Sequence, residues 1–116
     1  MKISELSHLK GAQLSAVTFV QDYVQLHFDG LRLNAYVWPQ VGIDDRLVAF
    51  PTLGYRDTLC GQIAKTVAQA SVYEMDRLEI QFVDGTRILI SFKEKDRVIV
   101  EAVELQDMNG KQWDVW

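Results

Sequence analysis

The stretch "VQLHFDGLRL", residues 24–33, has the pattern of a complete β-hairpin and decides the fold class. An Asp-Gly pair between two alternating apolar runs is a strong hairpin signal, because a type I′ turn needs a positive φ at both of its central residues. A turn at Asp29-Gly30 sorts the two strands into one apolar and one polar face, since side chains alternate along a strand. The expected apolar pairs are Phe28–Leu31, Leu26–Leu33 and Val24–Ala35, and the expected polar pairs are His27–Arg32, Gln25–Asn34 and Tyr23–Tyr36.

A second stretch, "LEIQFVDGTRILI" at residues 78–90, repeats this hairpin with one additional residue. A two-residue turn would mix the faces, whereas a three-residue turn over 83–85 keeps them separate and places glycine at the left-handed position of a G1 bulge. The expected pairs are then Leu78–Ile90, Ile80–Ile88, Glu79–Leu89 and Gln81–Arg87.

The similarity extends upstream of the two hairpins, where "LKG" at 9–11 matches "LCG" at 59–61. Internal similarity at an interval of about fifty residues is typical of repeated supersecondary units that bury a shared core. We therefore predict two tandem β-β-β repeats, at about 9–38 and 59–92, within a single domain that covers 1–116.

The segment "DTLCGQIAKTVAQA", residues 57–70, allows two interpretations. It fits a helix, with Asp57 or Thr58 as N-cap and an apolar stripe at helical spacing. The predicted repeat favours a strand, because the matching segment "AVTFVQ" is rich in β-forming residues. We favour the strand and leave open one helix near 58–70.

The remaining segments extend the β-structure. "RLVAF" at 46–50 predicts a short edge strand, and "RVIVEAVEL" at 97–105 predicts a strand that pairs with the second hairpin. The expected register places Val98, Val100 and Ala102 on the apolar face, opposite Phe92, Ile90 and Ile88. Trp113 and Trp116 in the tail are expected to close the fold. The fold class is therefore mainly β, a partly open barrel or sandwich.

Composition excludes several classes of function. The 116 residues include 48% hydrophobic and 24% charged residues, as in ordinary globular domains. The net charge of −4, with 12 basic residues scattered among 16 acids, argues against nucleic acid and anionic membranes as partners. The single cysteine fits the reducing cytoplasm, and no secretory signal or membrane span is evident in the sequence.

No pattern of reactive residues predicts catalysis. His8, His27 and Cys60 are not at the spacing of metal ligands, and no nucleophile elbow or phosphate-binding loop occurs. The two acidic pairs that could act as acid and base, Asp44–Asp45 and Glu74–Asp76, fall at expected turns. We expect no catalytic residues, no metal and no cofactor.

The polar face of the first hairpin carries the candidate binding residues. They are Tyr23, His27, Arg32, Tyr36 and Trp38. Tyr, Trp and Arg dominate the energetics of protein interfaces, because they combine rigid area with a directional polar group. Either this face is covered by the protein's own chain, with its aromatic residues half in the core, or it is a binding or dimer surface.

The order L-x-G, F-D-G, L-C-G, F-V-D-G and then "DMNGKQWDVW" resembles that of a group of small uncharacterised bacterial proteins with two similar halves and a Trp-containing tail. Similar small acidic β-rich chains occur among immunity proteins that neutralise secreted bacterial toxins. The resemblance implies a partner-binding role and supplies no catalytic residues. Our first hypothesis is a non-catalytic interaction protein with a protein partner or a second copy of itself. The alternative is a small-ligand or enzymatic domain with a pocket between the repeats that uses His27, Arg32 and Tyr23.

Overall fold

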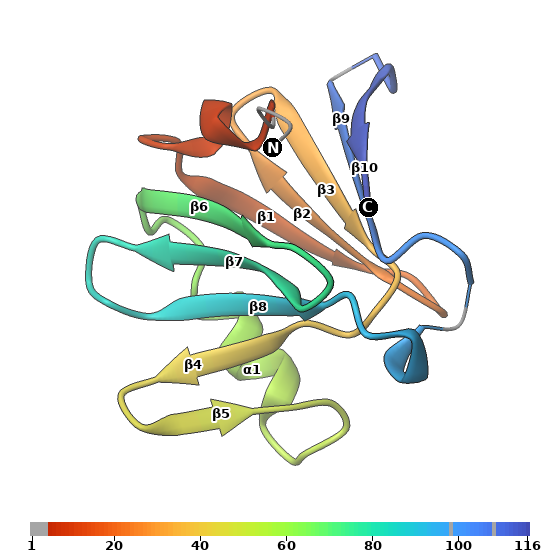
Figure 1. Ribbon diagram of the computed structural model, residues 1–116. Helices are drawn as coiled ribbons and strands as arrows, with labels where there is room; N and C mark the ends of the chain where they lie inside the picture. Colours follow the sequence, from red (N-terminus) through yellow and green to blue (C-terminus); the bar gives the residue numbers. More distant parts are fainter. Residues whose placement is uncertain (1–4, 98, 108) are drawn as a thin grey trace.

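A computed structural model describes residues 5–97, 99–107 and 109–116 and places two five-stranded antiparallel sheets face to face (Figure 1). The first sheet has the order β1 (Leu14–Phe19), β2 (Val24–Phe28), β3 (Leu31–Ala35), β9 (Val103–Asp107), β10 (Gln112–Val115). The second has the order β5 (Arg46–Val48), β4 (Gln40–Ile43), β8 (Arg87–Ser91), β7 (Arg77–Phe82), β6 (Val67–Tyr73). The described strands do not close into a barrel, so the prediction of a mainly β, sandwich-like fold is confirmed.

One core lies between the two sheets. The inward-facing residues of both hairpins, such as Leu26, Phe28, Ile80 and Ile88, have no exposed surface. The 3-10 helix η1 (Glu5–Leu9) packs against β6 and β10, and the helix α1 (Tyr55–Cys60) packs against β1. A second 3-10 helix, η2 (Glu94–Asp96), follows β8. None of these helices, which are all those in the described part of the chain, is long and apolar enough to cross a membrane.

The register of both hairpins agrees with the predictions. His27 pairs with Arg32 and Leu26 with Leu33 in the first hairpin, and Ile80 pairs with Ile88 in the second. The type of the first turn was predicted wrongly, because only Gly30 has a positive φ (92°) and Asp29 does not. The Asp29 carboxylate instead accepts a hydrogen bond from the Gln13 backbone N–H at 3.1 Å, which ties the turn to the start of β1.

Residues 57–70 form neither one strand nor one long helix. Helix α1 ends at Cys60, where the Gly61 N–H donates to the Asp57 carbonyl at 2.8 Å, and β6 begins only at Val67. The prediction of a strand is therefore wrong before Val67 and correct after it. Tyr55 and Leu59, one helical turn apart, are buried, which explains why a short helix is stable here.

Each half of the chain supplies its last hairpin to the other half's sheet. The β4–β5 hairpin follows β3 in sequence but pairs with β8, and the β9–β10 hairpin follows β8 but pairs with β3. The expectation that 97–105 pairs with the second hairpin is therefore wrong. Val100 is 81% exposed, while Leu105 of β9 is buried opposite Leu33. Val98, which was part of that expectation, lies outside the described residues.

The two halves meet through reciprocal backbone hydrogen bonds between the segments that precede β1 and β6. Gly11 N–H donates to the Val67 carbonyl at 2.9 Å, and Ala64 N–H donates to the Leu14 carbonyl at 2.7 Å. Gly11 and Ala64 also share a left-handed conformation, with φ of 87° and 78°. The match of "LKG" with "LCG" aligns Gly11 with Gly61. In the structure, however, the residue equivalent to Gly11 is Ala64. A sequence repeat between the halves remains a prediction.

Candidate functional site

The predicted binding residues occupy two regions of the molecule. Tyr23, His27, Arg32 and Tyr36 belong to the first sheet or its margin, with their side chains on the face away from the core. Trp38 lies after β3, where it packs on Phe50 and lines a hollow beside the second sheet. We call the first group, together with Asn34, Glu104 and Gln106, the tyrosine face.

An aromatic pair forms one end of the tyrosine face. The rings of Tyr23 and Tyr36 have centroids 5.3 Å apart at an angle of 41°, and both side chains are partly exposed. The Tyr36 hydroxyl donates to Glu104 Oε1 at 2.9 Å. Burial, and then this hydrogen bond, raise the pKa of Tyr36 to about 12. Tyr36 is therefore a fixed hydrogen-bond donor and not a proton acceptor at neutral pH.

Arg32 and Asn34 form the centre of the tyrosine face. The Arg32 guanidinium and the Asn34 amide both donate to Gln106 Oε1, the latter at 2.9 Å. Asn34 is 4% exposed, and neither its Oδ1 atom nor Arg32 Nε has a hydrogen-bond partner among the described residues. Gln106 therefore connects two side chains whose hydrogen-bonding capacity is only partly used.

Glu104 connects the face to β10. Burial opposes ionisation of Glu104, but hydrogen bonds from Gln112, Tyr36 and Asn34 outweigh that effect and lower the pKa of the carboxyl. Sequence analysis did not identify Glu104 and Gln106, because it placed their strand beside the second hairpin. The alternating polar residues of "VELQD" are a signal for one exposed face, but they do not identify the neighbouring strand.

His27 does not have the surroundings of a catalytic base. Its Nε2 atom is 3.1 Å from Thr18 Oγ1. Burial, and then the positive charge of Arg32, lower the pKa of His27, so the ring is neutral at pH 7. A general base is normally oriented by a carboxylate or carbonyl that accepts from its second ring nitrogen, and no such partner of His27 Nδ1 occurs among the described residues.

A hollow of about 460 Å³ lies beside the outer face of the second sheet. Trp38 and Phe50 form its apolar side, with ring centroids 4.4 Å apart and planes within 13° of parallel. Arg77, Lys93 and Lys95 provide positive charges around it. Sequence analysis did not predict this hollow, because its walls come from segments that are distant in sequence.

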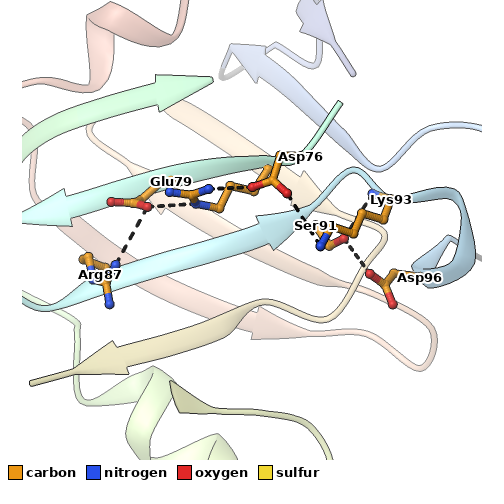
Figure 2. Close-up of polar contacts among 7 residues, drawn as sticks. Asp76, Glu79, Arg87, Ser91, Lys93 and Asp96 are labelled. Carbon is orange, nitrogen blue, oxygen red and sulfur yellow. Dashed lines mark hydrogen bonds and ion pairs between the residues drawn. The ribbon is translucent and has the colours of Figure 1, made fainter. Parts of the chain in front are cut away.

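A chain of ion pairs crosses the strands next to the hollow, as Figure 2 shows. Arg77 donates to Glu79 Oε1 at 3.0 Å and to Asp76 Oδ2 at 2.5 Å, and Arg87 lies 4.0 Å from the same Glu79 oxygen. A side chain at Gly42 would come within 3.0 Å of the Arg87 guanidinium, so the absence of one leaves room for this arginine. The hydrogen bond from Arg77 lowers the pKa of Asp76, which therefore stays ionised at neutral pH.

No protein-family model, curated protein or solved structure matches the chain. The resemblance to small bacterial proteins and to immunity proteins therefore remains a prediction. Within the described residues, no group of three or more His, Cys, Asp or Glu side chains could hold a metal ion.

Proposed function

We propose that the protein is a non-catalytic, cytoplasmic domain that binds a protein partner through the tyrosine face. The observation that carries this proposal is the contacting Tyr23–Tyr36 pair, partly exposed on the outer side of a sheet whose same face also carries Arg32. Tyr and Arg are among the residue types that contribute most to binding at protein interfaces. The single free cysteine, Cys60, supports the cytoplasmic location.

The shape and chemistry of the tyrosine face favour binding over catalysis. Small-molecule sites are concave. Neither the hollow beside the second sheet nor a smaller one of about 210 Å³, formed by residues 50–57, is lined by any of Tyr23, His27, Arg32 and Tyr36. Tyr36 keeps its proton at neutral pH and donates it to Glu104, and His27 lies against Thr18 rather than against a carboxylate. The alternative of an enzyme that uses His27, Arg32 and Tyr23 therefore has less support.

The partner that fits this face offers apolar side chains to the two rings and hydrogen-bond acceptors to Arg32 and the Tyr23 hydroxyl. Neutralisation of a toxin, as by an immunity protein, is one form that such binding takes. The other form is binding of a second copy of the chain. The mass of the complex distinguishes the two, because a homodimer has the mass of two chains.

The test combines light scattering with a pull-down from the native host, on the full chain and on Tyr23→Ala. This change removes a partly exposed ring, so we expect an unchanged urea midpoint and association weakened by roughly tenfold or more, as for a hot-spot residue. Tyr73→Ala, which removes a 43% exposed tyrosine from the second sheet, is the matched control and should associate normally.

Two results would contradict the proposal. One is unfolding of Tyr23→Ala, which would assign the ring to the core. The other is an equal loss of association in Tyr73→Ala and Tyr23→Ala, which would show that association does not depend specifically on the tyrosine face. A mass of two chains that falls to one in Tyr23→Ala identifies the partner as a second copy.

A further inference from the structure

The hollow beside the second sheet has a preformed aromatic wall. Phe50 stacks on Trp38 and contacts the edge of Tyr55, with ring centroids 5.7 Å apart. The Arg56 guanidinium lies 5.9 Å from the centroid of the same Phe50 ring. Tyr55 is buried and donates its hydroxyl to the Pro39 carbonyl at 2.5 Å. These contacts fix the Trp38 and Phe50 rings before any ligand is present. Packing a planar ligand against them therefore costs the protein little additional side-chain entropy.

The acidic groups of the hollow already have partners. Asp76 accepts from Arg77 and lies 3.6 Å from Lys93 Nζ. Asp96 accepts a hydrogen bond from the Ser91 hydroxyl at 2.6 Å (Figure 2). One of the two Asp96 carboxylate oxygens is therefore occupied. A cationic ligand would have to displace these contacts, and the hollow therefore does not favour one.

The basic groups, in contrast, have unused donors. An ammonium group has three N–H donors, and Lys93 uses one long contact to Asp76. Lys95 has no hydrogen-bond or ion-pair partner within the described ranges 5–97, 99–107 and 109–116. Asp76 and Glu79 pair with Arg77, so Lys93 and Lys95 outnumber the one remaining carboxylate of the hollow, Asp96, in a chain whose net charge is −4. The charge of the hollow is thus complementary to an anion.

We propose that the hollow binds a planar aromatic carboxylate, with its ring against Trp38 and its carboxylate at Lys95 and Lys93. The volume of about 460 Å³ lies in the range of small-molecule sites, about 300–1,000 Å³. The same chemical group is found in a free aromatic acid and in a C-terminal aromatic residue of another protein. This site is separate from the tyrosine face, and either can exist without the other.

The experiment titrates the full ¹⁵N-labelled chain with indole-3-acetate and, separately, with its neutral analogue indole-3-acetamide. We expect saturable shifts of the Trp38 indole N–H and of the Lys93 and Lys95 amides with both probes. The acid should bind roughly fivefold more tightly than the amide, because the two share the ring and differ in the charge that faces the lysines.

Lys95→Gln is the decisive variant, because it removes the ammonium group without breaking a described contact. It should lower the affinity for the acid severalfold and leave the affinity for the amide unchanged. Lys10→Gln, which changes an exposed lysine outside the hollow, is the control and should behave as the unchanged chain. Equal affinities for acid and amide, equal binding by Lys95→Gln, or no shift at millimolar probe would each overturn the proposal.

The source of the carboxylate is settled by the peptide Gly-Gly-Trp, with a free or an amidated C-terminus. If the free peptide binds more tightly than indole-3-acetate and amidation weakens it, the ligand is the C-terminus of a protein. If indole-3-acetate binds more tightly than the peptide, the ligand is a free aromatic acid. Tyr23→Ala should change neither result, so failure of the tyrosine face and failure of the hollow are distinguishable.

Discussion

At the scale of single residues, Asp84 in the β7–β8 turn carries a pH dependence. Its carboxylate lies 2.8 Å from Lys65 Nζ and accepts from the Thr86 hydroxyl and N–H. These hydrogen bonds, that from Lys65 first, lower the pKa of Asp84 to about 2. As the pH falls, the Asp84 carboxyl therefore becomes protonated in the unfolded chain before it does so in the folded chain. The stabilisation is complete above about pH 4 and is lost as the pH falls towards 2.

Asp84→Asn keeps an oxygen for the Thr86 bonds and removes only the charge. We expect it to lower the free energy of unfolding by about 0.5 kcal/mol at pH 7, since the pair is partly exposed. The effect should be clearly smaller at pH 2, where the folded-state carboxyl is about half protonated. Urea unfolding at the two pH values measures this difference. Asp45→Asn, in the exposed turn between β4 and β5, serves as control. A loss that is equal at both pH values would show that Asp84 acts through the turn and not through its charge.

At the scale of elements, local signals predicted the hairpins and missed the partner of β9. The pairing of Leu26 with Leu33 follows from a short turn and alternating side chains, which are visible in ten residues. The strand predicted over 97–105 carries apolar residues on both faces, so alternation alone allowed it to continue the second sheet. Only contacts between distant segments select β3 as its neighbour.

The same distinction applies to the candidate site. Tyr23, His27, Arg32 and Tyr36 were predicted to share a region because one hairpin brings them together. Gln106 and the hollow's lysines were missed because tertiary pairing brings them there. Asp76 was predicted correctly to lie in a turn, but its ion pair with Lys93 depends on where β8 ends. Local sequence thus predicts which residues of one hairpin lie close together, but it does not predict which distant residues line a hollow.

Two truncations distinguish the observed β9 from the one predicted from sequence. Leu105→Ala should lower the free energy of unfolding by about 2–5 kcal/mol, because it leaves a cavity in a fully buried position. Val100→Ala should change it by less than about 0.5 kcal/mol, because that side chain is 81% exposed. Denaturant unfolding measures both. The sequence-based register, with Val100 in the core, predicts a substantial loss for Val100→Ala instead.

At the scale of the whole molecule, the exchanged hairpins join the two halves into one cooperative unit. Removing β9–β10 would leave β3 at an open edge, and removing β4–β5 would do the same to β8. We therefore expect a single unfolding transition, in which native NMR signals from β2 and from β7 disappear at the same urea concentration. Leu26→Ala, in the first sheet, should shift the midpoint of both sets equally. A midpoint that moves only for β2 would contradict this coupling.

The exchange of hairpins also affects the chain while it is being synthesised. Translation proceeds from the N-terminus, so β1, β2 and β3 leave the ribosome well before residues 103–107 exist. During that interval the edge of β3 has no neighbour, and the buried face of the first sheet lacks its cover. An unpaired apolar strand edge is an aggregation hazard. The nascent chain therefore passes through a stage in which the first sheet is incomplete, and that sheet is completed only when β9 and β10 emerge.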